Sequence, residues 1–101
     1  MDEDMDRNPT VYILASKYRG VLYIGVTSNL QFRIWQHRQK LIKGFTRKYN
    51  IDRLVWFEQY EQMYDAIVRE KRIKKWNRDW KIRLVELTNP GWHDLYDEIL
   101  S

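Results

Sequence analysis

Three short runs of β-branched, aromatic and aliphatic residues each have the pattern of a strand. The first two runs cover residues 10–15 and 21–27, and the polar segment Ser16-Lys17-Tyr18-Arg19-Gly20 lies between them. This arrangement predicts an antiparallel hairpin with a five-residue loop. A third strand is expected over residues 53–60.

Ser28-Asn29 can cap a helix over about residues 30–42. Its apolar stripe is formed by Leu30, Ile34 and Leu41, and His37 falls inside that stripe at helical spacing. The basic segment 43–52 that follows is expected to be irregular.

Two more helices are expected over about residues 63–76 and 78–87, and Asn89-Pro90-Gly91 then breaks the chain. A last short helical turn fits residues 92–100. The resulting order β-β-α-β-α-α predicts an α+β fold, a small three-stranded antiparallel sheet flanked by helices.

The length of 101 residues fits one domain, which we place at residues 10–101 after a flexible acidic leader over 1–9. The absence of cysteine excludes disulfides, thiolate zinc sites and a cysteine nucleophile. No apolar run approaches the roughly 20 residues that span a membrane. The acidic N-terminus does not resemble a secretory signal, so we expect a cytoplasmic protein.

Positive charge is concentrated in the body of the chain, where residues 8–92 hold 17 Lys and Arg against 7 Asp and Glu. Such a balance favours a nucleic-acid partner or simply a well-solvated surface, and charge alone does not decide between them. Within residues 69–83, eight bases are interleaved with Trp76 and Trp80. We expect these two tryptophans to anchor the core rather than to stack on bases.

Glu70 interrupts the apolar stripe of the helix expected over residues 63–76. A carboxylate on an apolar face is rare unless it is paired or bound to a cation. One interpretation is an ion pair with Lys74 at i+4. The other is a metal-binding carboxylate, because Mg²⁺ prefers oxygen ligands and often uses one carboxylate with waters and substrate phosphate.

Four further residues carry candidate chemistry. Arg33 and His37 share a helix face, which suits a phosphate clamp beside a proton-transfer group, or a half-buried histidine beside a surface arginine. Tyr12 and Tyr23 lie on the paired strands, where tyrosines most often serve packing. Gly25, inside a strand, indicates the close approach of another backbone or a ligand.

Together these residues resemble the GIY-YIG nuclease superfamily, in particular its short single-domain members. The resemblance rests on Val11-Tyr12, Tyr23-Ile24-Gly25, the helix segment 28–37 with its Arg33 and His37, Glu70, and Asn89-Pro90-Gly91-Trp92. It covers about residues 10–96. One position departs from the pattern, since Thr10-Val11 stands where the family name begins with Gly-Ile.

The resemblance implies an endonuclease that hydrolyses DNA phosphodiester bonds with Mg²⁺ or Mn²⁺ held by Glu70. It implies that Tyr12 helps to deprotonate the attacking water, with nearby positive charge favouring its phenolate, and that Tyr23 helps to place the water or phosphate. Arg33 would stabilise the negative charge of the transition state. His37 would hydrogen-bond Tyr12 or relay its proton.

The expected contacts to DNA are Gly25, Lys48, Lys71, Lys74, Lys75 and Asn89. Two alternatives remain open: a catalytically silent nucleic-acid-binding module, and a subunit targeted to DNA by a partner protein or by homodimerisation. The sequence leaves open whether the substrate is single-stranded, duplex, flap or branched DNA, or RNA.

Overall fold

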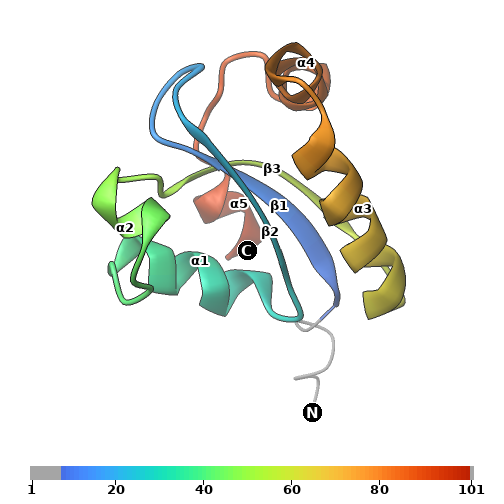
Figure 1. Cartoon of the computed structure of the whole chain (residues 1–101). Coiled ribbons are helices and arrows are strands. Elements are labelled where there is room, and N and C mark those ends of the chain that lie inside the picture. The colour runs from blue at the N-terminus through green and yellow to red at the C-terminus, as the bar shows by residue number, and fades with distance from the viewer. Residues whose placement is uncertain (1–7, 101) are drawn as a thin grey trace.

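The computed structural model describes residues 8–100, which form a three-stranded antiparallel sheet with helices on both sides (Figure 1). The strands are β1 (Thr10–Ala15), β2 (Leu22–Thr27) and β3 (Arg53–Gln59), in the spatial order β2-β1-β3. All six residues of β1 are buried because this strand is central. The predicted sheet is confirmed, and β2 forms one of its two edges.

The register of the hairpin decides which side chains share a face of the sheet. Tyr12 lies opposite Gly25, and Leu14 lies opposite Tyr23. Because directly opposed residues and residues two apart point to the same side, both tyrosines and Gly25 are on one face. The connection spans residues 16–21, one residue longer than the expected loop.

The helices are α1 (Leu30–Arg38), α2 (Phe45–Lys48), α3 (Met63–Lys75), α4 (Arg78–Thr88) and α5 (Tyr96–Ile99). Figure 1 shows α1 and α3 on opposite sides of the sheet. Each side has its own apolar core. The core under α3 and α4 comprises Val11, Ile13, Ala15, Ile24, Val55, Trp56, Ala66, Ile73, Val85 and Trp92. The core under α1 comprises Tyr12, Leu14, Leu30, Ile34, Ile51 and Leu54.

Helix α1 ends at Arg38, four residues before the predicted end. The Lys40 amide donates to the His37 carbonyl and the Leu41 amide donates to the Gln36 carbonyl. This is a Schellman closure, with Lys40 in the left-handed region at φ 59°. Leu41 is therefore 58% exposed and does not belong to the apolar stripe. The sequence concealed this end because a lysine occupies the position that glycine usually takes.

The segment predicted to be irregular contains the short helix α2. The Ile51 amide donates to the Thr46 carbonyl at 2.9 Å, which turns the chain back toward β3. Thr46 is buried in this turn, at 6% exposed, while Phe45 on the same short helix and Tyr49 directly after it are about half exposed. The segment is thus ordered around one inward-facing threonine.

The two tryptophans in the basic stretch behave differently. Trp76 is partly buried and packs against the core under α3 and α4. Trp80 is 51% exposed and contacts the Trp76 ring edge-on, at 5.8 Å between centroids. The expectation that both anchor the core is therefore wrong for Trp80, because half of its surface stays in contact with solvent.

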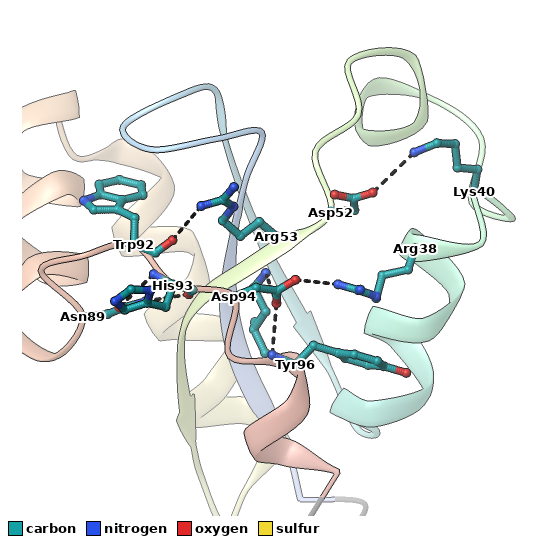
Figure 2. Close-up of polar contacts among 10 residues, drawn as sticks. Arg38, Lys40, Asp52, Arg53, Asn89, Trp92, His93, Asp94 and Tyr96 are labelled. Carbon is teal, nitrogen blue, oxygen red and sulfur yellow. Dashed lines mark hydrogen bonds and ion pairs between the residues drawn. The ribbon is translucent and has the colours of Figure 1, made fainter.

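The C-terminal segment is tied to the sheet by polar contacts (Figure 2). Arg53 donates to the Trp92 carbonyl at 3.0 Å. Asp94 accepts from the Leu54 amide at 3.3 Å and pairs with Arg38 of α1 at 2.6 Å. These bonds hold α5 against α1, on the side of the sheet that carries the tyrosines.

Most of the predicted acidic leader, residues 1–7, lies outside the described residues. At its end, the Pro9 carbonyl accepts a hydrogen bond from the Tyr60 amide at 2.7 Å, just beyond β3. Within residues 8–100 no helix combines the length and apolar character that a membrane crossing needs.

Candidate active site

Tyr12 lies at the centre of the site and depends on the glycine opposite it. The side chain is 2% exposed, and its ring lies over Gly25. A Cβ atom added to Gly25 would stand 2.4 Å from Tyr12 Cζ and 2.5 Å from Tyr12 Oη, closer than atoms can approach. The close approach predicted at Gly25 is thus made by the tyrosine ring, and this glycine is buried.

His37 joins this ring to a second hydroxyl. Its Nε2 lies 3.2 Å from Tyr12 Oη, and its Nδ1 lies 3.1 Å from Thr46 Oγ1. Both contacts are buried, so α1, α2 and β1 together fix the plane of the imidazole. The Tyr23 ring completes the cluster, with its centroid 5.7 Å from that of His37 and 6.3 Å from that of Tyr12.

Thr46 is a site residue that sequence reasoning missed. It stands in a polar segment nine residues beyond His37 and has no periodic relation to it. Only the Schellman closure and helix α2 return the chain to the imidazole. A single sequence contains no pattern that predicts such a contact.

Burial lowers the pKa of His37 to about 4, and the positive charge of Arg33 adds to the effect, while Asp52 opposes it. The imidazole is therefore neutral near pH 7. A neutral imidazole has one N–H donor and one acceptor nitrogen. One of the two hydroxyls must accordingly donate to the ring while the other accepts from it.

This shift predicts a loss of stability in acid. The pKa of His37 in the folded protein lies below its ordinary unfolded value of about 6.5. The unfolded chain therefore takes up a proton first as pH falls, and stability decreases between about pH 6.5 and pH 4. Urea unfolding across this range is expected to show the decrease in wild type and a shallower one in His37→Gln. Parallel curves would show that another group is responsible.

The pKa of Tyr12 is raised, first by burial and then by Tyr23 and by the negative charge of Glu70. Arg33 acts in the opposite direction but does not outweigh burial. The phenol is therefore neutral, and the expectation that nearby positive charge would favour the phenolate is not met in the free protein. Any role of Tyr12 in proton transfer must begin from the phenol.

Arg33 brings a positive charge to the site. It lies on α1, one turn before His37, and is partly exposed. No carboxylate within the described part of the chain forms an ion pair with it. Its charge acts on both Tyr12 and His37, as the pKa values of the two groups show. A partly exposed guanidinium of this kind is suited to a phosphate oxygen.

Glu70 comes from α3, on the other side of the sheet. It is 6% exposed and lies on the same buried face of α3 as Ala66 and Ile73. Its Oε2 pairs with Lys74 Nζ, as the simpler interpretation of the sequence predicted, and the Lys74 side chain is 53% exposed. The carboxylate charge raises the pKa of Tyr12, so it acts on the same phenol as Arg33.

The donor set at Glu70 fits a hard divalent cation. In residues 8–100 no cluster of three or more His, Asp or Glu side chains is arranged to hold a metal. Mg²⁺, however, commonly binds through one or two carboxylates and completes its shell with waters and substrate phosphate. A single buried carboxylate meets this requirement, provided that the metal displaces Lys74 or shares the carboxylate with it.

The other expected DNA contacts are dispersed. Lys71 and Lys75 are exposed on α3, and Lys48 is exposed on α2 with its Nζ 5.3 Å from the Tyr49 ring centroid. Asn89 is 5% exposed, and its amide bonds the backbone of Val55 and His93 (Figure 2). These bonds fix the end of α4 and give no support to a phosphate contact by Asn89.

The first hairpin thus gathers Tyr12, Tyr23 and His37, and the charges of Arg33 and Glu70 act on the Tyr12 phenol. The model of the GIY-YIG catalytic domain matches residues 8–83, and the chain belongs to this family.

The chain is also similar to several curated bacterial proteins. A UPF0213 protein of Clostridium perfringens is 40% identical over 75 residues, which cover 74% of this chain and 80% of the relative. A UPF0213 protein of Staphylococcus aureus is 31% identical over 67 residues, covering 66% of this chain and 82% of the relative. No solved structure gives a significant match.

Proposed function

We propose that the protein is a divalent-metal-dependent endonuclease that hydrolyses DNA phosphodiester bonds. The observation that carries the proposal is the hydrogen-bonded pair of Tyr12 and His37, buried and acted on by the opposite charges of Arg33 and Glu70. A phosphate held near Arg33 would lie beside a neutral phenol backed by a neutral imidazole. A phenol hydrogen-bonded to an imidazole can accept a proton from an attacking water and pass its own proton on.

The proton path follows from the two neutral groups. The water oxygen forms a bond to phosphorus as the bond from phosphorus to the leaving oxygen breaks, and the leaving oxygen then takes a proton from solvent. The water proton passes to Tyr12 Oη, and the phenol proton passes to His37 Nε2. His37 can accept it only if its Nδ1 carries the ring hydrogen and donates to Thr46 Oγ1. Thr46 thereby holds the tautomer that the step needs.

The charged residues serve the phosphate. Arg33 would bind a phosphate oxygen and stabilise the charge that grows there in the transition state. Glu70 would hold Mg²⁺ or Mn²⁺. When bound, such a cation supplies a Lewis acid at the phosphate and stabilises the departing oxygen. Tyr23, which contacts both Tyr12 and His37, would limit the positions open to the water.

One observation favours the second candidate, a nucleic-acid-binding module without turnover. Lys74 already neutralises the Glu70 carboxylate. A pure binder, however, gains nothing from a buried carboxylate and a buried Tyr–His pair. In either case we propose a cytoplasmic protein whose partner is DNA, acting as a homodimer or with a targeting protein.

Replacing Tyr12 with phenylalanine tests the proton path. The change removes only the hydroxyl and keeps the ring over Gly25, so the fold is expected to persist. Cleavage of labelled DNA in Mg²⁺ or Mn²⁺ should fall by about 10²–10⁴-fold, the usual contribution of general acid–base catalysis. The matched control is Tyr64→Phe, which removes a hydroxyl from a side chain that is 75% exposed. Equal cleavage rates in Tyr12→Phe and Tyr64→Phe would show that the Tyr12 hydroxyl takes no part in the reaction.

A further inference from the structure

A second basic feature lies between the hairpin loop and the junction of α3 and α4. It is a pocket with a volume of about 440 Å³. Its lining comprises Ser16, Lys17, Gly20, Val21, Leu22, Arg78 and Lys81. Three of these residues are cationic and none is acidic.

Two of the three cations are fixed in place without being neutralised. The Arg78 guanidinium donates to the carbonyls of Arg19 and Gly20, the latter at 2.8 Å. Lys81 Nζ donates to the Lys74 carbonyl at 3.3 Å. Carbonyl oxygens orient a cation but leave its full charge. By contrast, the neighbouring Arg19 is neutralised by a two-bond pair with Glu86.

The remaining lining groups add donors for an anion. Lys17 is exposed, and no carboxylate among residues 8–100 pairs with it. Ser16 Oγ accepts from the Val21 amide at 3.0 Å, so its own hydroxyl hydrogen is available to another acceptor. The pocket thus offers a hydroxyl and three ammonium or guanidinium groups, which is the chemistry of a phosphate site.

The position of the pocket connects it to the candidate active site. It lies at the start of β2, and Leu22 in its lining immediately precedes Tyr23. Lys74, whose carbonyl holds Lys81, also pairs with Glu70. One helical turn, about 6 Å along the axis, separates Glu70 from Lys74. The pocket therefore lies on the side of the sheet that carries Glu70, at the start of the edge strand β2.

We propose that this pocket binds a backbone phosphate of the DNA strand that is cut, at a phosphate other than the scissile one. The proposal rests on the proposed function and deepens it, because a second phosphate site beyond the scissile one fixes the direction in which the strand crosses β2. The ligand is a phosphodiester within a nucleic acid, not free phosphate.

The test measures DNA affinity against salt concentration in EDTA, where no cleavage occurs. Each lost phosphate contact lowers the slope of log affinity against log salt by about 0.7–0.9. Lys17→Gln and Lys81→Gln are each expected to show this decrease. Arg83→Gln, the control, removes the same charge from α4 outside the pocket and should leave the slope near that of wild type. Within residues 8–100 the Lys17 side chain forms no hydrogen bond or ion pair, so Lys17→Gln still tests the pocket if Lys81→Gln folds poorly.

A second readout identifies the ligand. An oligonucleotide is expected to shift the backbone amide resonances of Gly20, Val21 and Leu22 at concentrations where inorganic phosphate at equal ionic strength does not. Slopes equal to that of Arg83→Gln, or equal shifts with inorganic phosphate, would overturn the subsite. Neither readout needs turnover. If the wild-type protein cuts DNA but Lys17→Gln and Lys81→Gln leave the salt slope unchanged, only the proposed phosphate subsite is wrong. If these variants lower the salt slope but the wild-type protein does not cut DNA, only the proposed nuclease activity is wrong.

Discussion

Glu70→Gln is expected to reduce cleavage in Mg²⁺ or Mn²⁺ by about 10³-fold or more, because it removes the charge that would hold the metal. Binding of DNA in EDTA should be unchanged or tighter, since a negative charge leaves a site for a polyanion. The matched control is Glu58→Gln on β3, which also removes a carboxylate that is paired with a base, here Arg69. Cleavage by Glu70→Gln within tenfold of wild type would show that this carboxylate is not the metal ligand.

The same variant should remain folded, which separates chemistry from stability. The partner left behind, Lys74, is 53% exposed and can return to water. Glutamine keeps the volume of glutamate in the buried position. We expect the free energy of unfolding to change by about 1 kcal/mol or less, which thermal or urea unfolding measures directly. A large loss of stability would mean that the Glu70–Lys74 pair is chiefly structural.

Gly25→Ala is expected to damage both the fold and the site. The new Cβ would stand 2.4 Å from Tyr12 Cζ, and the ring is held between the sheet and α1, so either the ring or β2 must move. Overpacking of this kind costs about 1–3 kcal/mol. Moving the ring also breaks the 3.2 Å contact with His37, so cleavage should fall about as far as in Tyr12→Phe.

A double-mutant cycle isolates the cause of this loss. In a Tyr12→Leu background the clashing ring atoms are absent, so Gly25→Ala should destabilise the protein much less than it does in wild type. Additive effects in the two backgrounds would show that Gly25 is needed for another reason, such as the geometry of β2.

The parts of the fold that follow local patterns could be predicted from the sequence. The alternation of the first hairpin places Tyr12 and Tyr23 on paired strands, and the structure confirms that their rings meet. The polar interruption at Glu70 correctly marks a buried carboxylate on an apolar helix face. Both inferences rest on periodicity, which a single sequence displays directly.

What the sequence did not reveal depends on contacts between distant residues. Lys40 closes α1 in a left-handed conformation that favours glycine, so nothing local marked the end of the helix. Thr46 reaches His37 only because that closure and α2 return the chain. The neutral state of Tyr12 follows from a competition between burial and Arg33, and the depth of burial is known only once the fold is known.

We propose that Tyr12, His37, Arg33 and Glu70 form a metal-dependent phosphodiesterase site. The most direct measurement is cleavage of labelled single-stranded, duplex, flap and branched DNA by the wild-type protein in Mg²⁺, in Mn²⁺ and in EDTA. Glu70→Gln, purified in the same way, excludes a contaminating nuclease. We expect the wild-type protein to cleave at least one substrate internally when metal is present and to cleave none in EDTA. We expect no cleavage by Glu70→Gln. DNA that is bound yet left intact in both metals would contradict it and favour the binding module.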